Sequence, residues 1–138
     1  MFPGRRTVFG AMLVTLAWEA LCAEPTAKRI GTDEARRLAE VALKREYPRR
    51  DISLEFVRNP YDPVFIHFEA LWPNGPASPH LGNFAVNPRT GDVYDADSCK
   101  RLESPALSKL QESIRRRLKL RKADYLSARA KTPVCSAE

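Results

Sequence analysis

Histidine and cysteine are scarce in this chain, which has two histidines and three cysteines among its 138 residues. They are not spaced closely enough in the sequence to suggest a zinc site. The chain also lacks a glycine-rich phosphate-binding loop, and beyond residue 23 it has no apolar run long enough for a membrane-spanning helix. These absences argue against a zinc protein, a P-loop nucleotide-binding protein and a multi-span membrane protein.

The first 23 residues have the pattern of a secretory signal peptide. Arg5 and Arg6 supply a positively charged start, and residues 8–18 form an apolar run that is too short to span a bilayer comfortably. Cleavage near residue 23 would leave about 115 residues, the usual size of one domain. We therefore expect residues 1–23 to be a signal peptide, residues 24–138 to form one domain, and the protein to be periplasmic. The alternative is an ordinary N-terminal helix that is buried or anchors the chain.

Charge is distributed unevenly along the chain, whose net charge after cleavage would be about +5. Residues 51–97 hold seven acidic residues against two arginines, whereas residues 100–131 hold eleven basic residues against three acidic ones. The two regions would attract each other. The basic region is also a candidate surface for an acidic partner or for an anionic lipid or polymer. Export, and the lack of interleaved exposed aromatic residues, argue against nucleic acid as the partner.

Cys99 and Cys135 remain if Cys22 leaves with the signal peptide. An oxidising compartment would pair them, and closing so long a loop would stabilise the fold by roughly 3–4 kcal/mol. Two free thiols are the alternative. A straight helix over residues 105–129 would be about 37 Å long, and the six residues beyond it span only about 20 Å. This helix and the disulfide exclude each other, so we predict that the helix ends or bends near Leu120 and that the tail folds back.

Hydrophobic periodicity predicts a helix followed by antiparallel strands. An apolar stripe at helical spacing covers residues 32–47, with Thr32 as the N-cap and Pro48 ending the helix. Apolar and polar residues then alternate over residues 52–56, and residues 64–71 also have the pattern of a strand.

A last hairpin is predicted from two short apolar runs, residues 81–86 and 93–94, on either side of the turn 87–92. Pro88 presets φ for a turn, and Gly91 tolerates a positive φ. We expect an α+β fold in which the N-terminal helix packs on an antiparallel meander of three or four strands.

A basic amphipathic helix is predicted after the sheet. Ser104 is suited to its N-cap and Pro105 to its first helical position. Its apolar side comprises Leu107, Leu110, Ile114 and Leu118, and lysine and arginine cover most of the rest. We expect this C-terminal helix to close an edge or the other face of the sheet.

Few residues point to catalysis or to metal binding. His67 and Glu69 lie two apart on a predicted strand, so they share a face and could act as an acid–base pair, but no nucleophile or second acid accompanies them. Asp92, Asp95 and Asp97 do not have the spacing of a calcium-binding loop. We therefore predict no catalytic residues, no metal and no cofactor, and a protein that is not an enzyme.

The candidate partner-binding residues fall in two places. Trp72 and Phe65 are candidates for an exposed apolar contact near the proline-rich loop, and the alternative is that they pack under the C-terminal tail. Arg115, Arg116 and Lys119 on the basic helix are the candidates for contact with an acidic partner.

The order of the elements, together with two short motifs, resembles the PepSY-like domains of exported bacterial proteins. Residues 31–35 are similar to the acid-Ala start of their helix. The residues that fit their hairpin pattern V-D-x-x-T-G-E-V are Val86, Thr90, Gly91, Asp92 and Val93, whereas Asn87 replaces the usual acid. The resemblance covers residues 30–95. It implies a small α+β module that binds or restrains other exported proteins, often as a peptidase-inhibiting unit, without catalytic residues.

The sequence as a whole favours a binding protein whose partner is another exported protein. The first hypothesis is a non-catalytic periplasmic module that inhibits or modulates another envelope protein, a peptidase or a cell-wall hydrolase. A similar compact, exported, disulfide-bearing build occurs among periplasmic immunity proteins that neutralise secreted toxins, which is the second hypothesis. The third is a protein that binds an anionic polymer or lipid, although membrane contact is not expected.

Overall fold

The computed structural model describes residues 28–48, 51–75 and 79–135. The predicted signal peptide lies outside these residues. Within the described ranges, no helix is both long and apolar enough to cross a membrane.

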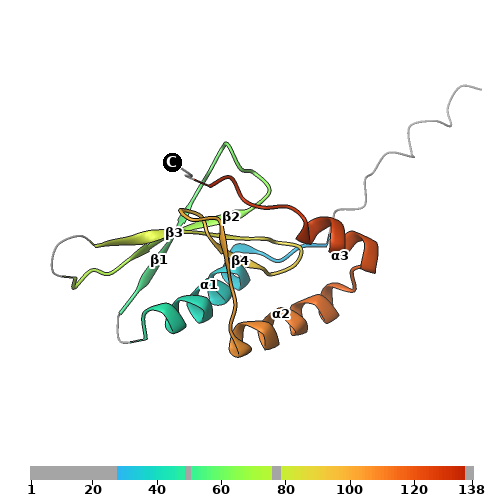
Figure 1. Cartoon of the computed structure of the whole chain (residues 1–138), viewed down its shortest axis with the longest axis horizontal. Coiled ribbons are helices and arrows are strands. Elements are labelled where there is room, and N and C mark those ends of the chain that lie inside the picture. The colour runs from blue at the N-terminus through green and yellow to red at the C-terminus, as the bar shows by residue number, and fades with distance from the viewer. Residues whose placement is uncertain (1–27, 49–50, 76–78, 136–138) are drawn as a thin grey trace, which may run out of the picture.

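The described residues form an antiparallel sheet and three helices (Figure 1). In chain order the elements are α1 (Thr32–Glu46), β1 (Ser53–Val57), β2 (Ile66–Leu71), β3 (His80–Val86), β4 (Val93–Asp95), β5 (Lys100–Leu102), α2 (Pro105–Leu118) and α3 (Lys122–Arg129). The strands lie in the sheet in the order β1-β2-β3-β4-β5, and each pair of neighbours is antiparallel. The predicted α+β meander is therefore confirmed, but the sheet has five strands rather than three or four.

The helix boundaries follow from local sequence signals. Helix α1 begins one residue earlier than predicted, because Thr32 is already helical and Gly31 occupies the N-cap without a side-chain hydrogen bond. The prediction of Thr32 as the N-cap is therefore wrong. Helix α2 begins as predicted, since the Ser104 hydroxyl accepts a hydrogen bond from the backbone N–H of Leu107 and Pro105 is the first helical residue.

Helices α1 and α2 pack next to each other on one face of the sheet, where they form the main core (Figure 1). The apolar stripes predicted for both helices point into this core. From the sheet, Val86, Val93 and Leu102 lie in register across three strands and bury their side chains on the same face. Burial of each such side chain stabilises the fold by about 1.5–3 kcal/mol, so this core orders the sheet and both helices together.

The predicted hairpin turn between β3 and β4 is buried rather than exposed. The Asn87 side-chain oxygen accepts hydrogen bonds from the backbone N–H groups of Arg89 and Thr90, at 3.0 and 3.3 Å. The Thr90 hydroxyl donates to the Asp92 carboxylate at 2.7 Å. Gly91 has φ of 75°, the left-handed value that this turn requires. The side chains of Asn87, Thr90 and Asp92 thus form hydrogen bonds within the turn, whereas the buried Nε of Arg89 has no hydrogen-bond partner among the described residues.

Both C-terminal helices bind this turn. From α2, the Gln111 side chain donates to the carbonyl of Gly91 at 3.0 Å. The Asn87 side chain donates to the carbonyl of Ala128 in α3 at 2.8 Å. An ionised aspartate could not donate this bond, so the contact requires the amide of Asn87.

The C-terminal region bends where the disulfide argument predicted. Helix α2 ends at Leu118, and Lys119 takes a left-handed conformation with φ of 48°. Helix α3 begins only at Lys122, so no straight helix runs to Arg129. The chain after α3 then returns toward the sheet on the side away from α1 and α2 (Figure 1).

We predict that Asn87→Asp destabilises the protein by about 1–3 kcal/mol at neutral pH, because the buried carbonyl of Ala128 loses its donor and faces a carboxylate. Urea unfolding measures this change. Asn74→Asp, at an exposed loop position, is the matched control. Equal stability of the two variants would contradict the role given to the turn.

Candidate functional site

The loop between β1 and β2, residues 58–65, projects beyond the end of the sheet (Figure 1). We refer to it as the 58–65 loop. The backbone N–H of Tyr61 donates to the Asn59 side-chain oxygen at 3.0 Å, and that of Asp62 donates to the Asn59 carbonyl at 3.3 Å. Pro60 and Pro63 restrict φ on both sides of these residues. The backbone of the loop is therefore held in one shape, with the Tyr61 side chain 86% exposed.

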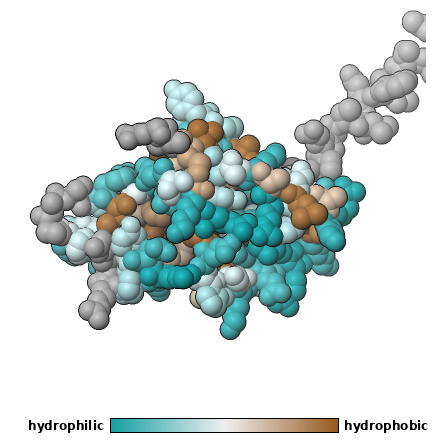
Figure 2. Space-filling model, in the orientation of Figure 1, coloured by the Kyte–Doolittle hydropathy of each residue, from teal (hydrophilic) through white to brown (hydrophobic). Residues whose placement is uncertain are grey.

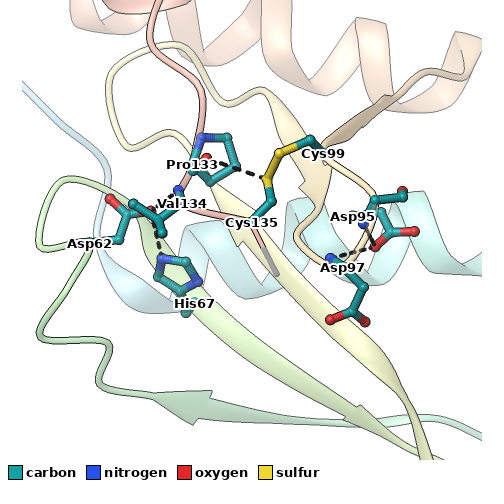
Figure 3. The surroundings of a disulfide bond; sticks show 9 residues. Asp62, His67, Asp95, Asp97, Cys99, Pro133, Val134 and Cys135 are labelled. Atoms are coloured by element: carbon teal, nitrogen blue, oxygen red, sulfur yellow. Dashed lines mark hydrogen bonds and ion pairs between the residues drawn. A yellow bond between two sulfur atoms is a disulfide. The ribbon is translucent and has the colours of Figure 1, made fainter. Parts of the chain in front are cut away.

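A buried carboxylate ties this loop to two other parts of the chain (Figure 3). Asp62 is only 5% exposed, and its Oδ2 lies 3.0 Å from both His67 Nε2 and the backbone nitrogen of Val134. Because an ionised carboxylate only accepts hydrogen bonds, Nε2 of His67 carries the hydrogen. His67 belongs to β2 and Val134 to the chain after α3, so a single side chain holds three segments together.

The predicted disulfide between Cys99 and Cys135 is present in the structure (Figure 3). Its Cα atoms are 5.6 Å apart and its cysteines are separated by 36 positions. The bond fastens residues 130–135, which we call the C-terminal segment, to the turn between β4 and β5. It thereby fixes the position of Val134, which binds Asp62.

A second, smaller core lies on the sheet face opposite α1 and α2. Its residues are Phe65, Ala85, Tyr94 and Ala96. The rings of Phe65 and Tyr94 meet edge to face, with centroids 5.8 Å apart. Burial raises the pKa of the Tyr94 phenol above its ordinary value of 10.0, and the negative charge of Asp92 raises it further. Phe65 is 7% exposed, so it is not the exposed contact that the sequence suggested.

Other hydrophobic side chains are exposed around the 58–65 loop. Figure 2 shows hydrophobic side chains gathered at the top of the molecule, where this loop and the C-terminal segment lie. The residues are Phe56, Val57, Val64 and Val134, with exposed fractions of 51%, 38%, 46% and 57%. With Tyr61 they form the loop surface, the name we keep for these five residues. Exposed apolar side chains clustered in this way are typical of protein-binding sites.

Two hollows flank the loop. The larger has a volume of about 540 Å³ and lies between the loop and the chain leading into α1, with Arg29 and Arg58 in its wall. The smaller, of about 310 Å³, lies on the other side of the loop, with Tyr61, His67 and Val134 in its wall. The loop is thus a ridge between two depressions, a shape that fits a concave partner surface.

The remaining predicted binding residues lie elsewhere and do not form one site. Trp72 follows the end of β2 that is distant from the 58–65 loop, is half-buried, and packs its ring against Gly75. Arg115 is engaged inside the molecule, where Nε donates to the Thr90 carbonyl at 3.3 Å and the guanidinium lies 4.9 Å from the centre of the Tyr125 ring.

Arg116 and Lys119 are exposed, as expected. They lie on the basic surface of α2, the second candidate contact region. Of the predicted set, they are the residues whose side chains are directed to solvent.

The residues considered as candidates for catalysis or metal binding also form hydrogen bonds with different partners. His67 binds Asp62, whereas Glu69 Oε1 lies 2.8 Å from His80 Nδ1. His67 and Glu69 therefore do not act as a pair. Asp95 accepts hydrogen bonds from two backbone N–H groups of the β4–β5 turn. In the described ranges, no three His, Cys, Asp or Glu residues are grouped to hold a metal ion.

Tyr61 and its exposed neighbours were missed by the sequence reasoning, which named no binding residue between the two predicted strands, in residues 57–63. A usable signal was present, because Tyr61 stands between Pro60 and Pro63 in a segment without strand or helix periodicity. A large aromatic residue in such a short, restricted turn is a candidate for contact with a partner when it does not pack inward.

Comparison with known proteins gives one informative likeness. The chain is similar to a chain of a type VI secretion system effector–immunity complex from Pseudomonas protegens, at 26% sequence identity and a TM-score of 0.59. The match covers 73% of this chain and 87% of that chain. No family model and no curated protein matches, so membership of the PepSY-like family stays a prediction.

We predict that reduction of the Cys99–Cys135 bond lowers the free energy of unfolding by about 3–4 kcal/mol, since the closed loop is long. Urea unfolding with and without dithiothreitol measures the difference. The Cys99→Ser/Cys135→Ser variant should match the reduced protein and should not respond to the reductant. An oxidised protein no more stable than this variant would contradict the prediction.

Proposed function

We propose that this protein is an immunity protein that binds a secreted toxin and neutralises it. The observation that carries the proposal is the similarity to a chain of an effector–immunity complex, which extends over 87% of that chain. The second of the sequence hypotheses is therefore favoured over the first, in which the partner is an envelope peptidase or a cell-wall hydrolase.

The arrangement of the described residues supports a role in binding. The loop surface offers exposed aromatic and aliphatic side chains on a backbone that is already ordered, and such preorganisation reduces the entropy lost on association. By contrast, His67 and Glu69 are occupied by internal partners. Neutralisation by binding requires no catalytic group, so we propose that the protein is not an enzyme.

We further propose that the protein acts in the periplasm. Disulfides persist in oxidising compartments, and the Cys99–Cys135 bond is consistent with export by the signal peptide predicted over residues 1–23. The toxin would then be one that acts on the cell envelope. The PepSY-like resemblance is consistent with this function, because those domains also restrain other exported proteins.

The test uses the oxidised protein, residues 24–138, as bait in an extract of the cells that produce it. We expect one protein to be recovered in equimolar amount and to resist washing with high salt. When exported alone in a bacterial host, that protein should stop growth. Export of both proteins together should restore growth, because the complex blocks the toxin.

Two other results would contradict this function. Recovery of a non-toxic envelope peptidase or cell-wall hydrolase, with its activity inhibited, would favour the first sequence hypothesis. Recovery of anionic polymer or lipid alone, released by high salt, would favour the third, since exposed charge contacts are screened at high ionic strength.

A further inference from the structure

The 58–65 loop has the properties of an inserting element. It projects from the body of the molecule, and its backbone is fixed by the turn at Asn59 and by the hydrogen bond that the Asp62 side chain accepts from Val134. Tyr61 stands at 86% exposure between two prolines. Tyrosine supplies a large contact area for few rotatable bonds, and it is enriched among the residues that dominate binding energy.

The shape of the surroundings indicates a concave partner. Hollows of about 540 and 310 Å³ lie on the two sides of the loop. A flat partner surface would leave both hollows unfilled. A partner with a cleft would receive the loop in that cleft, and the two rims of the cleft would fill the hollows. Exposed side chains of the loop surface, among them Val64 on one side and Val134 on the other, would line the contact with apolar groups.

The charge of the larger hollow indicates the chemistry of that partner. Arg29 and Arg58 are exposed in its wall, and no ion pair joins either of them to another described residue. The acidic residue in the same wall, Asp62, is buried and already accepts two hydrogen bonds. The accessible charge is therefore positive, and it complements carboxylates on a partner.

The basic surface of α2 and α3 is the competing site, and it is less suited to tight binding. Several of its arginines pair within the chain: Arg117 with Glu34, Arg121 with Asp124, and Arg115 with Asp92. Among its large apolar residues, Leu126 of α3 is exposed, at 52%. Exposed charges contribute more to association rate than to affinity, and among the described residues this surface has one exposed large apolar side chain against the five of the loop surface.

Together these observations lead to one inference, which rests on the proposed function. We propose that the 58–65 loop inserts into a cleft of the toxin lined with acidic side chains, with Tyr61 as the central anchor and Arg29 and Arg58 facing carboxylates of the rim.

The test measures the dissociation constant of the protein captured by the bait for variants of this chain. Tyr61→Ala should raise the dissociation constant on the order of thirtyfold, as loss of an anchor residue does. Arg58→Glu should raise it about tenfold or more, mainly by slowing association, and should reduce the salt dependence of binding. Because both side chains are exposed, circular dichroism should show unchanged folding.

Matched controls are available on the competing surface. Leu126→Ala removes an exposed apolar side chain, and Arg116→Glu reverses the charge of an exposed arginine. Both should bind the partner as the unaltered protein does. If these variants weaken binding while Tyr61→Ala and Arg58→Glu do not, the inference is overturned and the function stands.

The same set of variants distinguishes the other outcomes from one another. A captured protein that is not toxic refutes the proposed function, while the loop variants still report whether the loop makes the contact. Vesicles of phosphatidylglycerol provide the membrane arm. If the unaltered protein binds these vesicles, and Arg58→Glu abolishes vesicle binding but not binding to the captured protein, the inference is overturned in favour of a lipid headgroup.

Discussion

The arrangement of the candidate site depends on one buried carboxylate. Asp62 accepts hydrogen bonds from a side chain of β2 and from the backbone of the C-terminal segment, at 3.0 Å each. Loss of either donor would leave a buried charge short of a partner, which typically costs several kcal/mol. The carboxylate therefore selects a single position for the 58–65 loop. Its second donor, Val134, is positioned in turn by the disulfide of the adjacent residue, Cys135. Formation of this disulfide therefore helps to fix the shape of the loop surface.

This dependence links the oxidation state of the two cysteines to the shape of the loop surface. In a reducing environment, the C-terminal segment would lose its covalent attachment to the β4–β5 turn, and the Val134–Asp62 hydrogen bond would have to hold it without that support. The loop would then lose part of its preorganisation, and binding would carry a larger entropy cost. If the loop surface makes the proposed contact, the protein therefore reaches its full affinity only when Cys99 and Cys135 are oxidised.

The sequence predicted those elements whose signals are local. Ser104 and Pro105 located the start of α2, and the apolar stripes of α1 and α2 identified the core. Strand β5 was missed because three residues, of which Leu102 alone is buried, carry too little pattern. The sequence also could not show that Phe65 points inward and Tyr61 outward, because the contact that orients this loop joins residues 72 positions apart. The bend after Leu118 was predictable only because pairing of the cysteines excluded a straight helix.

The most direct test of the account is hydrogen–deuterium exchange of this protein, free and bound to the partner that the bait recovers. Insertion of the loop into a cleft buries its backbone, so we predict that slowed exchange on binding is concentrated in residues 57–64 and in the C-terminal segment. The exposed faces of α2 and α3 should exchange as in the free protein. Protection confined to α2 and α3, with the 58–65 loop unchanged, would contradict the account.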